Sequence, residues 1–285
     1  MAVMANCRLV AVAWKLDPSV LLNLYTDENI KEPAMAYRED PDLVFLSKLD
    51  SESLNDLVYT LIYDKDGDIR MTEELTTNDT YKRHNPDHNQ YWDLIAAEIQ
   101  CFGGNTFATM FRGGKGVLYR EVLQDVCDKL KVNYNSNTSV EKIENNLLMK
   151  ILTDAVESMD QDQIKELADS VGISNAGLLT PEAMVGVFQT VFRAGGFKSY
   201  QLTLIIVNTV LKHLIGRGLT LAANAALTRT MSVLMGPVGW AITGAWTAVD
   251  VASAAYRVTI PAVIQVAALR QKHSIGAMAS QVSFG

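Results

Sequence analysis

Cysteine is scarce in this chain of 285 residues, which contains only three cysteines. Cys7, Cys101 and Cys127 are far apart and odd in number, a pattern that excludes a small disulfide-rich scaffold. We interpret them as reduced thiols of a cytosolic protein. Free cysteine usually behaves as a small buried hydrophobic residue, and we favour that role over a catalytic thiol.

Aromatic residues are also scarce, at 8% of the chain, although hydrophobic residues make up 48%. This balance predicts helices rich in aliphatic side chains. Charged residues make up 20%, and together with the hydrophobic content this excludes the composition of a disordered chain. The length is sufficient to bury a sizeable core and to form two domains.

A convincing signal peptide is absent as well. The apolar run near the start, Leu9–Trp14, is short and is interrupted by Lys15 and Asp17. We therefore expect a cytoplasmic location, with association with the inner membrane left open.

Acidic residues are nearly absent from the last third. From Ser199 onward there are six basic residues and one acid, Asp250, so this part carries a net charge of +5. The whole chain carries −7, so the part before Ser199 carries −12. Such asymmetry predicts either an anionic partner or an electrostatic fit within the molecule. We do not expect nucleic-acid binding, because the basic residues are dispersed and the front is acidic.

Helical periodicity recurs along the front of the chain. Apolar residues at helical spacing predict helices over about 51–62, 89–101 and 118–131, and a long helix that follows Thr138 and runs through Val156. The sequence therefore predicts an all-α fold. The start signals are a cap at Asp50 or Ser51, a capping box at Thr138–Glu141, Asp160, and Thr180-Pro181-Glu182.

We divide the chain into four parts by composition. Residues 1–41 form an N-terminal extension and linker, and residues 42–196 an acidic helical domain. Residues 197–272 form an apolar, basic region that we predict to contain a Gly/Ala-rich helical hairpin, and residues 273–285 a flexible tail.

Two metal-like patterns in the front lack the residues that metal binding requires. Read from Asp64 as a calcium loop, the chain has Ile69 and Leu75 where glycine and glutamate are needed, so we predict an Asp-Gly turn. His84 and His88 are four apart, but they lie in a predicted loop without further ligands. We therefore interpret both histidines as solvated, and we predict no metal or cofactor.

Two glycine-rich stretches flank a predicted short helix over 107–111. Gly103-Gly104 has the pattern of a hinge, because glycine permits positive φ. The stretch 112–116 contains Gly and Lys, but Thr109 and Gly116 replace residues that a Walker A loop requires, so we predict a basic turn. An enzyme site here would join Asn105, Arg112, Tyr119, Arg120 and Glu121, a set without a nucleophile–base pair.

The apolar third contains an uncharged run of 20 residues, Thr230–Val249. A helix of this length could cross the hydrocarbon core of a bilayer. The same run could instead form two short helices in the core of a soluble protein, with Pro237 ending the first. Asp250 and Arg257, seven residues apart, could form an ion pair if one helix ran through both.

The last strong apolar segment is Tyr256–Arg270. Pro261 predicts that a helix begins near it or is kinked there, because the residue before proline is disfavoured in helices. Arg257 would need pairing or hydration here, as an ion-pair partner, a lipid contact or a functional cation. The candidate functional residues are Gly103, Gly104, Asn105, Arg112, Tyr119, Arg120, Asp250, Tyr256, Arg257 and Pro261.

Several long motifs resemble the YaaW-like family of uncharacterised bacterial proteins. They include Phe102–Thr106, Leu118–Lys131, Gly236–Gly239 and Tyr256–Arg270, and the resemblance extends over about Asp42–Lys272. It implies a bacterial origin and supplies no established activity. Some relatives are described as similar to a ubiquinol–cytochrome c chaperone.

Two functional hypotheses follow from the sequence. The leading one is a non-enzymatic helical protein that associates with or inserts into a membrane through its last third, with a toxin-like or defence-related role as one version. The alternative is a soluble chaperone-like or assembly-factor binding module. The corresponding partners are membrane lipid or another protein, and the apolar third offers a surface for oligomerisation.

Overall fold

The computed structural model describes residues 37–70, 73–103, 116–170, 180–220 and 256–282. These residues form an all-α fold, as predicted, and the β-structure among them is limited to an isolated bridge between Tyr63 and Ile69. The α-helices are α3 (Ser51–Ile62), α4 (Asp79–His84), α5 (Trp92–Gly103), α7 (Tyr119–Lys129), α8 (Val140–Glu157), α9 (Gln161–Ser170), α10 (Pro181–Ala194), α11 (Gly196–Leu214) and α13 (Tyr256–Val282). Three short 3-10 helices are η2 (Val44–Lys48), η3 (Leu75–Thr77) and η4 (His88–Tyr91).

The predicted start signals at Asp50, Asp160 and Thr180 are found where helices begin, whereas α8 has Ser139 and not Thr138 before its first residue and no side-chain cap bond. The Asp50 carboxylate caps α3 by accepting the backbone N–H of Ser53 at 2.7 Å. The Thr180 hydroxyl caps α10, whose first residue is Pro181. Such caps satisfy backbone N–H groups that have no partner within the helix. Short-range chemistry therefore determines these boundaries.

The stretch after α3 is the predicted turn. The Asp64 carboxylate accepts the backbone N–H groups of Asp66 and Asp68, each at 3.0 Å. Gly67 adopts a φ of 85°, a conformation that glycine reaches without steric cost. The turn leads into the bridge between Tyr63 and Ile69.

His88 differs from its prediction as a solvated side chain. It is only 4% exposed. Its Nδ1 bonds to the Tyr91 hydroxyl, and its Nε2 lies 3.1 Å from Asn55 Oδ1. The prediction failed because the partner of Nε2, Asn55, comes from α3, far away in the sequence.

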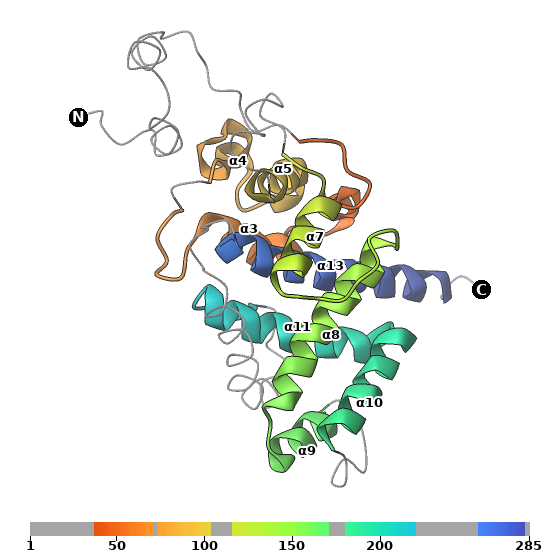
Figure 1. Ribbon diagram of the computed structural model, residues 1–285. Helices are drawn as coiled ribbons and strands as arrows, with labels where there is room; N and C mark the ends of the chain where they lie inside the picture. The colour runs from red at the N-terminus through yellow and green to blue at the C-terminus, as the bar shows by residue number, and fades with distance from the viewer. Residues whose placement is uncertain (1–36, 71–72, 104–115, 171–179, 221–255, 283–285) are drawn as a thin grey trace.

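Helix α13 lies at the centre of the molecule. Figure 1 shows it crossing the middle, with α5 above it and α11 below it in that view. It contacts α3, α5, α7, α8 and α11, and nearly every side chain from Val258 to Leu269 is buried. These side chains belong to one continuous hydrophobic core that includes residues from both the predicted acidic domain and the predicted apolar region.

The burial of α11 and α13 bears on the predicted membrane segment. Most apolar side chains of both helices pack against each other and against the front of the chain, so burial in the protein already removes them from water. Among the described residues, no helix combines the length and the apolar character needed to span a bilayer. The uncharged run Thr230–Val249, where the hairpin was predicted, lies outside the described residues.

The bounds of α13 differ from expectation at both ends. The helix begins at Tyr256 and runs through Pro261. Because Pro261 follows the first turn closely, its missing N–H removes one bond near the helix start. The helix continues to Val282, where a flexible tail was predicted.

Candidate functional site

A buried ion pair fixes α13 to α8. Arg270 Nε donates to the Glu144 carboxylate at 3.0 Å, and the two residues are 8% and 2% exposed. The Tyr119 hydroxyl donates to the same carboxylate at 2.7 Å. Three helices therefore meet at one buried carboxylate.

Arg270 and Glu144 each oppose the effect of burial on the other's charge, although burial still raises the pKa of Glu144. Burial alone would lower the pKa of the Arg270 guanidinium, but the Glu144 carboxylate raises it and the net shift is upward. Burial, followed by the negative charge of Glu144, raises the pKa of Tyr119 well above its ordinary value. Tyr119 therefore stays a neutral hydrogen-bond donor.

The same arginine also holds the start of the described chain. Arg270 Nη2 donates to the Asp42 carbonyl oxygen at 2.7 Å, and its guanidinium lies 4.4 Å from the Phe45 ring centroid. A cation over an aromatic face is attracted by the ring quadrupole. Arg270 thus fixes the second half of α13 both to α8 and to the segment that contains Asp42 and Phe45.

A second polar anchor lies at the end of α11. The buried Asp56 carboxylate of α3 accepts Arg217 Nη2 at 3.0 Å and the Thr220 backbone N–H at 2.9 Å. The Asn208 side chain accepts the Leu219 N–H at 2.9 Å. These bonds fix the segment after α11 against α3.

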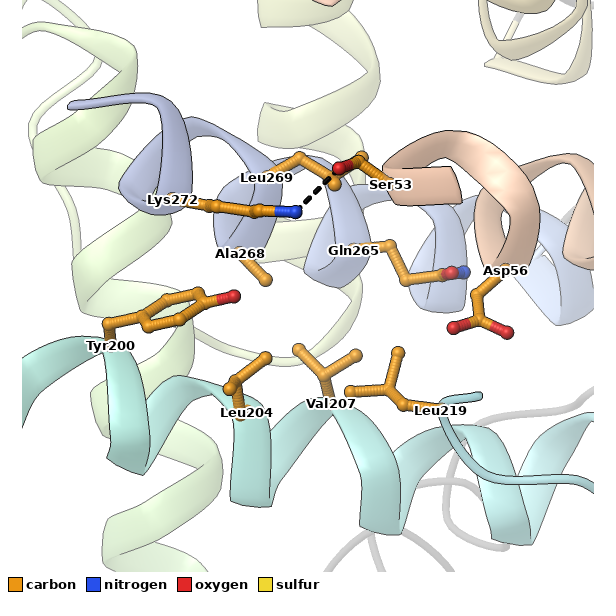
Figure 2. Close-up of a pocket in the computed structure, with 10 residues that line it drawn as sticks. All are labelled: Ser53, Asp56, Tyr200, Leu204, Val207, Leu219, Gln265, Ala268, Leu269 and Lys272. Atoms are coloured by element: carbon orange, nitrogen blue, oxygen red, sulfur yellow. Dashed lines mark hydrogen bonds between the residues drawn. The ribbon is translucent and has the colours of Figure 1, made fainter. Parts of the chain in front are cut away.

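A pocket of about 80 Å³ lies between α3, α11 and α13. Figure 2 shows Leu204 and Val207 pointing from α11 toward α13, with Ala268 on the opposite wall. The apolar lining is completed by Leu219, Leu269 and the ring of Tyr200. The polar lining residues are Ser53, Asp56, Gln265 and Lys272.

The pocket is polar at one end. Lys272 Nζ donates to Ser53 Oγ at 2.5 Å, and Ser53 Oγ donates to Asp50 Oδ1 at 2.6 Å. The Tyr200 hydroxyl points into the space between α11 and α13 (Figure 2), and it makes no hydrogen bond with any described residue. Burial raises the pKa of Tyr200, which keeps this hydroxyl a donor.

An apolar stripe leads along α11 to the pocket. Phe197, Tyr200, Leu204 and Val207 follow the three- and four-residue spacing that places side chains on one helix face. The first of these, Phe197, is 63% exposed, whereas Val207 is fully buried. The stripe therefore runs from an exposed aromatic ring into the pocket.

The front candidates predicted from sequence form part of the scaffold. Gly103 ends α5, and Tyr119 lies in the buried cluster. Arg120 Nη1 donates to the Thr138 carbonyl at 2.7 Å, holding α7 to the start of α8. Glu121 caps α7 by accepting the Leu118 N–H. Their predicted functional roles stay predictions.

The candidates near α13 are spread over its first turns. The Tyr256 hydroxyl donates to Asp125 at 3.1 Å, and Lys129 lies over its ring. Arg257 is exposed and forms no ion pair with a described residue, while Pro261 is buried. Gly104, Asn105, Arg112 and Asp250 lie outside the described residues, and so does the predicted pairing of Asp250 with Arg257.

Apart from Tyr119, sequence reasoning missed the residues that build the pocket and its supports. Glu144 reads as an ordinary helical acid, and Tyr200 and Lys272 carry no motif. Arg270 had one usable signal, because it ends a long apolar run and a guanidinium there requires a partner. Its partner Glu144 lies in a different helix, and no local pattern identifies it.

Comparison with known families assigns most of the described chain. Residues 87–264 match the family described as ubiquinol-cytochrome C chaperone. Residues 37–71 match a domain family of unknown function, DUF3944. No solved structure matches the chain. The pocket combines α3 from the second match with α11 from the first, and its α13 residues lie just beyond residue 264.

The chain matches several curated relatives over nearly the full length of each relative. A UPF0174 protein of Helicobacter pylori strain J99 is 52% identical over 238 residues, 84% of this chain and 94% of the relative. A second UPF0174 protein of that strain is 42% identical over 206 residues, 71% of this chain and 98% of the relative. The UPF0174 protein YaaW of Escherichia coli K12 is 34% identical over 241 residues, 82% of this chain and 95% of the relative.

These findings correct the leading functional hypothesis. The prediction of a protein that associates with or inserts into a membrane through its last third is wrong, because the matching family is one of chaperones and the described helices of that third are packed in the core. The family match favours the alternative, a chaperone-like or assembly-factor module. The resemblance to the YaaW-like family is confirmed: the chain belongs to the UPF0174 family that includes YaaW, and residues 87–264 belong to the ubiquinol-cytochrome C chaperone family.

Proposed function

We propose that this protein is a chaperone-like assembly factor that acts by binding another protein. The observation that carries the proposal is the apolar stripe on α11, which begins at the exposed Phe197 and ends in the pocket. Exposed aromatic residues beside a pocket are typical of protein-binding surfaces, where a few anchors supply most of the affinity. The family match supports a role of the same kind.

The supports of the pocket favour recognition by a preformed surface. Arg270 and Asp56 fix α13 and the end of α11 through buried or half-buried bonds, and Thr203 Oγ1 of α11 lies 3.0 Å from Gln271 Oε1 of α13. A surface that is already ordered loses little conformational entropy on binding. A partner therefore meets the stripe and the pocket in their binding arrangement.

Site-specific photo-crosslinking tests this proposal. A photo-crosslinking amino acid at Phe197, in the full chain expressed in bacteria, should yield a discrete crosslinked protein. Substitution Ala268→Leu fills the pocket and should lower the yield about fivefold, as expected for loss of one anchor contact. The crosslinked protein, once identified by mass spectrometry and purified, should bind the wild-type chain in a two-component titration.

The matched control places the same amino acid at Ile69. This residue is 56% exposed, comparable with Phe197, but it lies on the turn after α3 and does not line the pocket. The Ile69 position should not capture the same protein. The same crosslinked species at both positions would contradict the proposal, because it would show contact without use of the stripe.

A further inference from the structure

The dimensions of the pocket limit what can enter it. Its volume of about 80 Å³ is roughly half that of an engineered apolar cavity of about 150 Å³ that binds benzene. It therefore has room for a branched chain of about four carbons and excludes a long acyl chain. Leu204, Val207 and Ala268 provide an apolar floor for such a group.

The polar end of the pocket offers donors that can bind a further acceptor. The Tyr200 hydroxyl has no hydrogen-bonding partner among the described residues. The Lys272 ammonium uses one of its N–H groups on Ser53 and forms no ion pair with a described carboxylate. Both side chains are half-buried, so they can still donate to an acceptor that enters the pocket.

At the other end of the pocket, the charge of Asp56 is already paired. The Asp56 carboxylate is matched by Arg217 at 3.0 Å and by the backbone and side chain of Thr220. Asp56 therefore offers little attraction to a cationic ligand. At the opposite end the Asp50 carboxylate interacts with Lys272 from behind Ser53. The Lys272 ammonium forms no ion pair with a described residue and keeps N–H groups for an acceptor or an anion at that end.

We propose that the pocket holds a leucine-like side chain of the partner protein, with an adjacent carboxylate on Lys272 and Tyr200. This inference rests on the proposed function and adds the chemistry that the partner must carry. A peptide is favoured over a free small acid because the α11 stripe continues outside the pocket to Phe197, where it can cover the rest of a polypeptide segment. Recognition then combines a buried aliphatic anchor with one charge-assisted contact at the rim.

Methyl NMR of the full chain tests the inference with defined peptides. The probes are N-acetyl-Leu-Glu-amide, N-acetyl-Leu-Gln-amide and N-acetyl-Gly-Glu-amide, with isovalerate as the free-acid probe. The first should shift the methyl signals of Leu204, Val207 and Ala268 with a Kd of about 1 mM, a reasonable affinity for so few contacts. The Gln peptide should bind about fivefold more weakly, as expected for loss of one exposed charge contact, and the Gly peptide should cause no shift at these methyls.

Three variants separate the anchor from the charge. Lys272→Gln should remove the preference for Glu over Gln and still bind the Leu peptides. Ala268→Leu should abolish binding of both. Lys165→Gln changes an exposed lysine on α9, distant from the pocket, and should behave like wild type. Circular dichroism confirms that each variant is folded before titration.

Three results would overturn the inference. One is the absence of pocket methyl shifts with the Leu-Glu peptide, and another is an unchanged preference for Glu in Lys272→Gln. The third is tighter binding of isovalerate than of the peptide, which would assign the pocket to a small acid. If one of these results is obtained and the crosslink from position 197 still forms, the proposed function stays in place. If no crosslink forms from position 197 in a chain without other substitutions, the proposed function itself is contradicted.

Discussion

A guanidinium group is buried at Arg270, and its position there depends on a single carboxylate, that of Glu144. Moving a charge from water into a protein interior is unfavourable, and only close, well-aligned partners offset it. Arg270 has such partners in Glu144, the Asp42 carbonyl and the Phe45 ring. Removing one member of the cluster should therefore lower the free energy of unfolding much more than replacing both charged residues together.

We predict that Glu144→Ala lowers the free energy of unfolding by about 3–5 kcal/mol, because it leaves the Arg270 charge buried without its carboxylate. Urea unfolding followed by circular dichroism measures the change. The double variant Glu144→Leu, Arg270→Met removes both charges and should recover most of the loss. A double variant as unstable as Glu144→Ala would contradict this account.

His88 predicts a pH dependence of stability. Burial lowers its pKa below the ordinary value, and the nearby Asp87 carboxylate only partly opposes this. Below a pH of about 6.5 the unfolded chain therefore binds a proton that the folded chain does not, so stability falls as the pH falls through this range. Urea midpoints between about pH 7 and pH 5 should decrease, and His88→Gln should decrease less over that range. An equally steep decrease in this variant would assign the effect to other groups.

At the scale of elements, features set by local chemistry could be predicted from the sequence, and features set by tertiary contacts could not. Caps such as Asp50 and Thr180 act within one helical turn, so the sequence predicts where α3 and α10 begin. The burial of His88 and the continuation of α13 through Pro261 depend on neighbours from distant elements. Periodicity therefore predicts the helices, and it does not predict which side chains other helices cover.

The approach of α5 to the start of α7 gives a testable case. A Cβ atom at Gly116 would lie 2.1 Å from the carbonyl carbon and oxygen of Gln100. Atoms this close clash, so one of the two backbone segments would have to move. We predict that Gly116→Ala lowers the free energy of unfolding by about 1–3 kcal/mol through this overpacking. Thermal and urea unfolding measure the loss.

The matched control is Gly186→Ala in the middle of α10. A Cβ atom there meets no atom within 4 Å. Because alanine favours helix over glycine, this variant should gain about 0.5–1 kcal/mol. Equal effects at the two glycines would show that helix propensity, and not the contact with Gln100, determines the result.

At the scale of the whole molecule, the pocket shows why the site could not be read from the sequence. Its walls come from α3, α11 and α13, which are adjacent only after the chain has folded. Lys272 and Ser53 are 219 residues apart in the sequence, yet they are hydrogen-bonded. The charge asymmetry between front and back was visible in the sequence, and its physical counterpart is an internal fit in which Arg217 and Arg270 meet acids of the front.

This internal fit predicts that the described helices unfold together. The core is continuous from α3 to α13, and Cys127 of α7 lies within it, fully buried, with a pKa raised by burial to about 12. Its thiol should therefore stay unlabelled by a maleimide pulse until the fold is lost, because the thiolate is the reactive form. Peptide-resolved mass spectrometry across a urea series should place Cys127 labelling at the same midpoint as the loss of helical circular dichroism. Labelling at clearly lower urea would show that α13 separates from α7 before the rest unfolds, and the chain would then consist of two units with independent stability.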